Sequence, residues 1–143
     1  MTDYIAPLRE FNFVINELAG LEEISKLPGF EHATDDLLEP ILEEASRFAC
    51  EVLGPTNVIG DEQRCSVENG VVKVPSEFSE AYQLFVESGW QGLDCSQDYG
   101  GMGLPALIGS ATAEMWQSAN LALGLCPMLT SGAIDTVELH ATD

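Results

Sequence analysis

The clearest pattern of hydrophobic and polar positions lies in residues 37–53, where apolar residues recur every three or four positions. The opposite positions carry the charged side chains Glu39, Glu43, Glu44, Arg47 and Glu51. This spacing puts the apolar residues on one face and predicts an amphipathic helix. We expect Thr34 or Asp35 to cap its amino terminus with a side-chain oxygen. Gly54 and Pro55 are expected to end it.

An earlier amphipathic helix is predicted from about Pro7 to Leu18, because its apolar residues also fall at helical spacing and Gly20 lies just past its end. A linker that contains Pro28 and Gly29 follows. The first third of the chain is therefore expected to hold one helix and a loop before the main amphipathic helix.

A small β-hairpin is predicted between Arg64 and Pro75, where short β-prone runs flank the pair Asn69-Gly70. Ser76 is then expected to cap a helix that ends at Gly89. Further on, Pro105 is expected to open a long helix to about Leu125, and Pro127 to start a last helix from about Met128. The pattern predicts a mainly α fold with about five helices and one hairpin.

Composition sets the class of protein. The chain has 143 residues, 45% of them hydrophobic, which suits one domain with a real core. Its 24 acidic and 5 basic residues give a formal charge of −19, which disfavours binding to nucleic acid or to anionic membrane surfaces. Without a signal peptide or a long apolar run, the sequence predicts a soluble, cytoplasmic protein.

Charge is unevenly distributed along the chain. All five basic residues lie in the first 73 positions, and the only charged residues from Pro105 onward are Glu114, Asp135, Glu138 and Asp143. The helix predicted from Pro105 to about Leu125 has apolar or small residues nearly all round. Such a helix is normally covered on several sides. The last third is therefore expected to be an interior or interface piece of something larger.

The sequence has no pattern typical of a metal site or of a reactive cysteine pair. Cys50, Cys65, Cys95 and Cys126 are at least fifteen residues apart, so they form no paired ligand motif. We expect reduced, mostly buried thiols. His32 and His140 are isolated from other ligand types, and no metal site is expected.

The glycine-rich stretch Gly89–Pro105 has two interpretations. A phosphate-binding loop is one, but Ala106 takes the last glycine position of G-x-G-x-x-G, and neither a preceding strand nor a nearby basic residue is present. The other is a connection in which glycines allow two helices and a loop to pack closely. The sequence favours the packing connection.

The same stretch resembles a known family. The pattern GW-x-GL, then YGGxGLP, then a helix bearing Glu114, is similar to the amino-terminal α-domain of the FAD-dependent acyl-CoA dehydrogenases. The matching residues are Gly89, Trp90, Gly92, Leu93, Asp98, Tyr99, Gly100, Gly101, Gly103, Leu104 and Pro105. Residues 114–143 resemble the family's next two helices. The opening residues and the hairpin resemble the subgroup with an extended amino terminus, the 3-methylmercaptopropionyl-CoA dehydrogenase-like proteins.

The resemblance spans Tyr4 to Asp143 and implies a fold of about five to six helices with one small hairpin. It implies an extension helix and linker at 1–33 and the family's amino-terminal α-domain at 34–143. In the family, FAD is held by a central β-barrel domain, and a glutamate in a carboxy-terminal helical domain is the catalytic base. The resemblance implies that both domains lie outside these 143 residues. We therefore expect no catalytic or cofactor-binding residue here, and Glu114 to be a surface or packing carboxylate.

The resemblance implies that this domain supplies part of the acyl pocket, from helices at about 115–125 and 128–139. The candidate pocket residues are Leu123, Gly124, Pro127 and Met128. Simple core packing accounts for these four positions equally well.

The predicted function is that of the amino-terminal portion of an FAD-dependent acyl-CoA dehydrogenase, inactive alone. The implied partners are acyl-CoA, the missing domains or a partner chain, and electron-transfer flavoprotein, with an oligomeric full-length form. The alternative is a stand-alone helical interaction module derived from that family. An acyl-carrier-like protein is disfavoured because no attachment serine lies in a D-S-L-type context. The sequence does not indicate which acyl-CoA is used.

Overall fold

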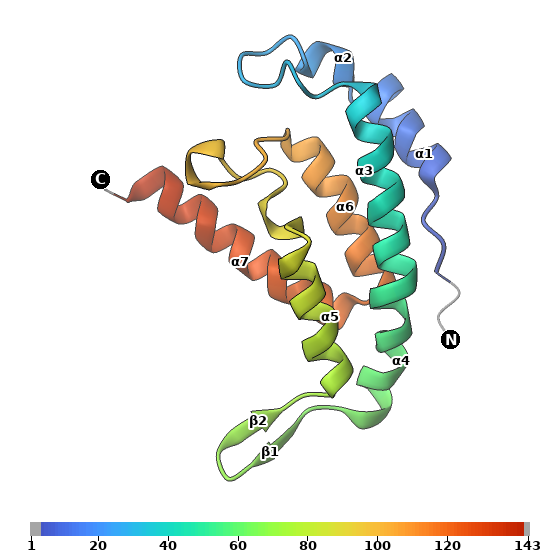
Figure 1. Cartoon of the computed structure of the whole chain (residues 1–143), viewed down its shortest axis with the longest axis vertical. Helices are drawn as coiled ribbons and strands as arrows, with labels where there is room; N and C mark the ends of the chain where they lie inside the picture. Colours follow the sequence, from blue (N-terminus) through green and yellow to red (C-terminus); the bar gives the residue numbers. More distant parts are fainter. Residues whose placement is uncertain (1–3, 142–143) are drawn as a thin grey trace.

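Helices account for most of the computed structural model, which describes residues 4–141 (Figure 1). The helices are α1 (Leu8–Phe13), α2 (Leu21–Ile24), α3 (Asp35–Phe48), α4 (Gly54–Gln63), α5 (Ser76–Glu87), α6 (Ala106–Ala119) and α7 (Leu121–His140). Two π-helical segments (Val14–Leu18 and Ala49–Leu53) and two 3-10 turns (Trp90–Gly92 and Gln97–Tyr99) join them. Strands β1 (Ser66–Glu68) and β2 (Val71–Lys73) pair antiparallel. The predicted mainly α fold with one hairpin is confirmed.

The amphipathic helix does not end at Gly54 and Pro55, so that prediction is wrong. Gly54 has helical dihedral angles, φ −53° and ψ −48°, and the chain continues directly into α4. The π-helical segment before it has already interrupted the usual hydrogen-bond ladder, with the Gly54 N–H donating to the Ala49 carbonyl. A proline can follow there because its missing N–H removes no regular helical bond.

The predicted side-chain caps of two helices are also absent. Thr34 precedes α3 in an extended conformation, but its side chain makes no capping hydrogen bond. Pro75, not Ser76, precedes α5, and Ser76 is the first helical residue. Both helices therefore begin where the sequence predicts, but without the predicted side-chain bond.

The break between the last two helices falls at Asn120, not between Leu125 and Pro127 as predicted. Asn120 is extended and 1% exposed, and its Oδ1 accepts a hydrogen bond of 3.1 Å from the Leu123 N–H. Its Nδ2 donates to Thr56 Oγ1 at 2.8 Å. Capping and a buried side-chain partner thus fix the start of α7, and Pro127 lies inside it.

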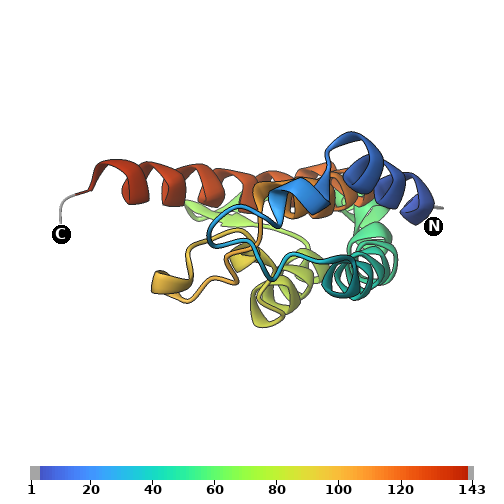
Figure 2. The ribbon, with the colours of Figure 1, turned by 90° about the horizontal axis from the view of Figure 1, so that it is seen from above.

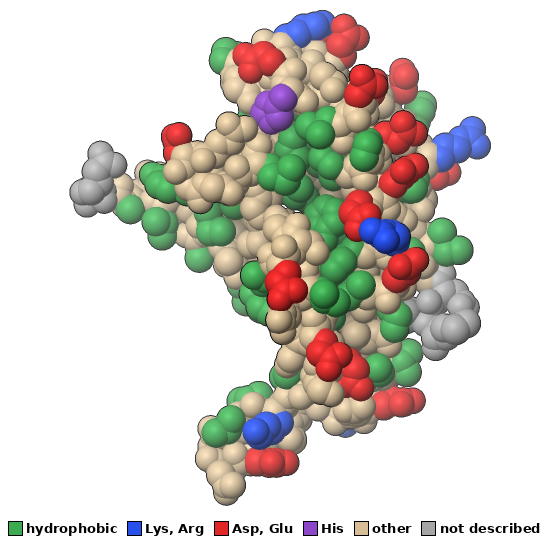
Figure 3. Space-filling view, in the orientation of Figure 1, with side chains coloured by type: hydrophobic (Ala, Val, Ile, Leu, Met, Phe, Trp, Pro, Cys, Tyr) green, Lys and Arg blue, Asp and Glu red, His purple; other side chains and the backbone are tan. Residues whose placement is uncertain are grey.

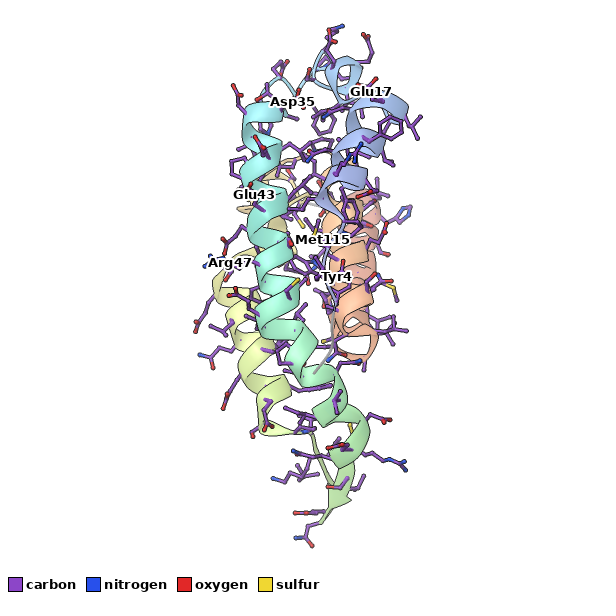
Figure 4. The ribbon with its side chains drawn as sticks, turned by 90° about the vertical axis from the view of Figure 1, so that its right-hand side faces the viewer. Tyr4, Glu17, Asp35, Glu43, Arg47 and Met115 are labelled. Atoms are coloured by element: carbon purple, nitrogen blue, oxygen red, sulfur yellow. The ribbon has the colours of Figure 1, made fainter. Side chains whose placement is uncertain are left out.

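Aromatic rings form the centre of the core, where α3, α5 and α6 meet. Phe48, Phe85 and Trp90 surround Trp116, with ring centroids 5.5, 5.9 and 5.1 Å from it. Met115 is fully buried and lies between α3 and α6 (Figure 4). One hydrophobic cluster runs from Ala6 to Leu123, so it includes residues on both sides of position 33. The division into two domains stays a prediction.

The glycine-rich stretch folds back on itself. The Met102 N–H donates to the Gly92 carbonyl at 2.8 Å, and the Leu104 N–H donates to the Leu93 carbonyl at 2.9 Å. At Gly101, an added Cβ atom would overlap the backbone carbonyl of Cys95. The neighbour that requires glycine there is protein backbone, which confirms the packing connection.

The second half of α7 extends away from the other helices (Figures 1 and 2). Its Leu129, Val137 and Leu139 are 71%, 62% and 76% exposed. Hydrophobic side chains are visible along this helix towards the carboxyl terminus (Figure 3). Only one face of α6 is buried, so the expected covering on several sides is not met within this chain, and α7 leaves much of its apolar surface open. Within residues 4–141, no helix combines the length and apolarity that crossing a membrane requires.

The cysteines are less buried than predicted. All four are free thiols, with Cys65 and Cys126 exposed and Cys50 and Cys95 half-buried. The prediction of mostly buried thiols is therefore wrong, because Cys65 lies just outside the core beside the hairpin and Cys126 faces outward on α7.

Candidate functional site

A cavity of about 190 Å³ lies between the segment 90–94, α6 and the first half of α7. We call it the Trp90 cavity. Its lining includes Trp90, Gln91, Trp116, Gly124, Pro127 and Met128. Aromatic, aliphatic and amide groups thus share one concave surface, a combination typical of small-molecule sites.

The wall formed by Trp90 depends on the end of α5. Gly89 has a left-handed conformation, φ 75°, which ends the helix and turns the chain into the Trp90–Gly92 turn. The Trp90 ring is 9% exposed and lies against Trp116, with centroids 5.1 Å apart. The positive φ at Gly89 therefore brings an indole from the loop against one from α6.

Gln91 ties this turn to α7. Its Nε2 donates to Ser131 Oγ at 2.9 Å and approaches the Pro127 carbonyl at 3.4 Å. The Ser131 hydroxyl in turn donates to the Pro127 carbonyl at 3.2 Å. These bonds connect segments about forty residues apart and fix the opposite walls of the cavity relative to each other.

A glycine also lets α7 approach α6 closely. A Cβ atom added at Gly124 would lie 3.2 Å from Gln117 Cγ and 3.4 Å from Gln117 Cα. Those distances are at the tight end of van der Waals contact, so a larger residue would push the two helices apart. Gly124 is thus a packing residue as well as part of the cavity wall.

Three of the four candidate pocket residues line the cavity. Gly124 and Pro127 are buried in its wall, and Met128 is 47% exposed. Leu123 is 5% exposed and belongs to the hydrophobic core instead. Whether any of the four contacts an acyl chain stays a prediction.

The pocket residues predicted from the sequence include none from the loop that forms one wall of the cavity. In the sequence, Trp90 is notable only as part of the glycine-rich pattern, and no local pattern marks Gln91, Trp116 or Ser131 as pocket residues. The one local signal was an aromatic residue directly after a helix-ending glycine. Its contact with α6 and α7 depends on tertiary packing.

The charges near the cavity are acidic. Burial is the main cause that raises the pKa of the Cys95 thiol, and the nearby carboxylates of Asp94, Asp135 and Glu138 raise it further. Glu114 is exposed on α6 and does not line the Trp90 cavity, which agrees with the prediction of a surface carboxylate.

The indole nitrogen of Trp90 is a buried donor. Trp90 Nε1 has no hydrogen-bond partner among the residues that the structure describes. Most buried polar atoms in folded proteins have a partner, so such a donor needs an explanation.

A flavin does not fit the Trp90 cavity. Its volume of about 190 Å³ lies below the roughly 300–1,000 Å³ typical of sites for drug-sized ligands. Its lining in the described chain includes neither Lys nor Arg, which would neutralise a pyrophosphate. These residues suit a short, mostly apolar group.

Comparison with known proteins bears on the predicted resemblance. No protein-family model matches the chain. The chain is 39% identical over 140 residues to 3-methylmercaptopropionyl-CoA dehydrogenase of Ruegeria pomeroyi. The predicted resemblance to the acyl-CoA dehydrogenases is confirmed. The match includes 98% of this chain and 24% of the relative, so the chain spans about a quarter of the relative's length.

Proposed function

We propose that this chain is the amino-terminal portion of an FAD-dependent acyl-CoA dehydrogenase and that it supplies part of the acyl pocket. The observation that carries the proposal is the Trp90 cavity, whose wall contains Gly124, Pro127 and Met128. These residues lie in the segment that resembles the family's acyl-pocket helices. The identity to a dehydrogenase that acts, by its name, on an acyl-CoA supports the same assignment.

The part played by these residues is to hold and desolvate the acyl group. α,β-Dehydrogenation of an acyl-CoA needs a base, a hydride acceptor and a dry slot that fixes the chain. The Trp90 cavity offers a small, mostly apolar surface for such a slot, with Gln91, Asp94 and Ser131 among its polar lining residues. The base and the flavin site belong to the remaining parts of the proposed enzyme.

The proposal extends to the partners of the whole enzyme. We place it in fatty acid metabolism in the cytoplasm, as an oligomer that passes electrons to electron-transfer flavoprotein. The four free cysteines support a reducing compartment. The exposed apolar side chains of α7 support an interface with further domains or with a partner chain.

Two assays test this function. The purified 143-residue chain, given FAD, butanoyl-CoA and an artificial electron acceptor, is expected to show no turnover. A chimera in which this chain replaces the matching segment of the Ruegeria enzyme is expected to bind FAD and oxidise an acyl-CoA. Turnover by the isolated chain, or a folded chimera that fails to oxidise any acyl-CoA, contradicts the proposal.

Within the chimera, substitutions at the cavity separate a pocket from ordinary core. Met128→Trp introduces a larger side chain at the partly exposed wall and is expected to lower kcat/KM for butanoyl-CoA about tenfold or more. Val67→Trp is the matched control, because Val67 in the exposed strand β1 is 71% exposed, outside the cavity and away from α7. Equal effects of both variants would remove the argument for a pocket.

The exposed half of α7 favours a second candidate function, a helical module that binds another protein. A hollow of about 530 Å³ lies between Tyr99 and the outer turns of α7, lined by Ile134 and Val137 among others. Light scattering of the isolated chain tests this candidate. A monomer that binds no apolar dye argues against an interaction surface there.

A further inference from the structure

A carboxylate lies in the wall of the Trp90 cavity, against the first turn of α6. Asp94 and Gly109 are both lining residues. A Cβ atom added at Gly109 would overlap Asp94 Oδ2, so this oxygen lies directly against the backbone of the helix. The carboxylate therefore takes the place on α6 that a side chain of residue 109 would otherwise fill. Asp94 is exposed, so a ligand that enters from solvent can reach it.

This negative charge has no positive partner in the described part of the chain. The salt bridges within residues 4–141 join Lys26 and Arg47 to nearby glutamates, and none includes Asp94. All five basic residues lie in the first 73 positions, and none of them lines the cavity. The cavity therefore presents an uncompensated carboxylate, which favours a ligand with a positive charge.

The rest of the wall favours an apolar body on that ligand. Trp90, Trp116 and Phe85 line the cavity. Gly109 and Trp116 are two helical turns apart on α6, which separates the carboxylate from the Trp116 end by about 10 Å along the helix. An elongated group with an apolar body and one positive end is complementary to both ends, and aromatic faces also attract cations.

The volume limits the ligand to a short chain. An engineered apolar cavity of about 150 Å³ holds benzene, so a cavity of about 190 Å³ takes roughly six to eight non-hydrogen atoms. A chain of four or five carbon atoms that ends in an ammonium group is of about this size.

We propose that the Trp90 cavity selects short acyl groups whose far end carries an ammonium group, through the carboxylate of Asp94. This inference rests on the proposed function, because it takes the cavity to receive the acyl chain. It adds a substrate class and a specificity-determining residue. A neutral chain of the same length gains the apolar contact alone and leaves the carboxylate without a partner.

The test compares n-butylammonium with 1-butanol, which has the same carbon chain and a neutral end, on the 143-residue chain at neutral pH. The chain has two tryptophans, Trp90 and Trp116, and both line the cavity, so intrinsic fluorescence gives the dissociation constants. We use the ratio of the two constants, butanol over butylammonium, since a change in cavity size affects both probes alike.

In Asp94→Asn this ratio is expected to fall by about 2- to 5-fold, the range for an ion pair that is open to water. Asp98→Asn is the matched control, because Asp98 is an exposed residue of the same loop that does not line the cavity. Its ratio should stay within about 1.5-fold of the unaltered chain, since water and salt screen a charge that the probe does not touch.

A second readout needs no variant. In the unaltered chain, the NMR signal of the Gly109 backbone amide should shift more with butylammonium than with butanol, because Gly109 lies against the carboxylate. Four results overturn the proposal: an unchanged ratio in Asp94→Asn, equal falls in both variants, equal shifts of the Gly109 amide with both probes, or no binding of butylammonium.

Butanoyl-CoA, with CoA alone as its control, separates this failure from failure of the proposed function. Shifts of the Gly124 and Met128 amides with butanoyl-CoA but not with CoA keep the acyl pocket, even where Asp94 shows no preference, because both residues line the cavity. Without such shifts the acyl pocket is refuted, and the selectivity among acyl groups is refuted with it.

Discussion

Asn120 offers the most direct test of how the two long helices are arranged. Its carboxamide caps α7 through the Leu123 N–H and donates to Thr56 Oγ1 in the core, at 3.1 and 2.8 Å. Asn120→Ala removes both bonds. Loss of the cap costs about 1 kcal/mol and loss of a buried hydrogen bond about another 1. We expect the free energy of unfolding to fall by about 2–3 kcal/mol, since the Leu123 N–H also stays buried.

The assay is urea and thermal unfolding followed by circular dichroism. In a chain of this size, the expected loss lowers Tm by roughly 6–10 °C. Asn57→Ala is the matched control, because Asn57 is exposed on α4 and alanine favours the helix slightly. A loss below about 0.5 kcal/mol for Asn120→Ala, inside the range of ordinary surface substitutions, would refute the reasoning.

A double-mutant cycle isolates the bond to Thr56. Thr56→Val keeps the shape of the side chain and removes the hydroxyl that accepts from Asn120 and donates to the Leu53 carbonyl. We expect a coupling energy of about 1 kcal/mol between the two positions. Additive effects would show that the two side chains act independently, so that Asn120 stabilises the chain through the cap alone.

Three further substitutions or reactions test other features of the structure. Gly101→Ala, whose Cβ would overlap the Cys95 carbonyl, should lower stability by about 1–3 kcal/mol, while Gly132→Ala, with nothing within 4 Å, should raise it slightly. Iodoacetamide should label Cys95 more slowly than the exposed Cys65, because the thiolate reacts and the pKa of Cys95 is raised. Because the pKa of the Cys95 thiol is raised only in the folded state, the unfolded chain loses the thiol proton at a lower pH, and the free energy of unfolding falls as pH rises above the ordinary pKa of 9.0. Equal labelling rates for Cys95 and Cys65 would contradict the raised pKa of Cys95. Gln91→Ala should speed amide hydrogen exchange around Ser131, and unchanged exchange there would show that the bond does not hold α7.

The sequence predicts the helices well where one face repeats over many residues. Residues 37–53 are such a case, because each apolar position independently supports the same face. Local stop signals were less reliable. Gly54 and Pro55 favour a helix end, but the preceding π-helical segment accommodates both, and nothing in the local pattern distinguishes the two outcomes.

The break at Asn120 could not be found from local pattern either. Asn120 is held by Thr56, which is 64 residues away in the sequence. Local pattern instead places the start of the helix at Pro127, because proline is common at the first helical position. The cavity, too, is predictable from the sequence only in part. Gly124, Pro127 and Met128 follow from resemblance to a family, but the Trp90 wall exists only because a turn packs against two distant helices.

The hairpin contributes nothing to the core, since all six residues of β1 and β2 are exposed. At its tip, Asn69 and Gly70 hold φ values of 52° and 77°, and the hairpin lies at the far end of the molecule from α2 (Figure 1). Exposed tips of this kind tolerate insertions, and doubling a loop costs only about 0.6 kcal/mol. An epitope or fluorescent reporter grafted at this tip can therefore follow the chain in mixtures and in assembly assays while the Trp90 cavity and α7 stay untouched.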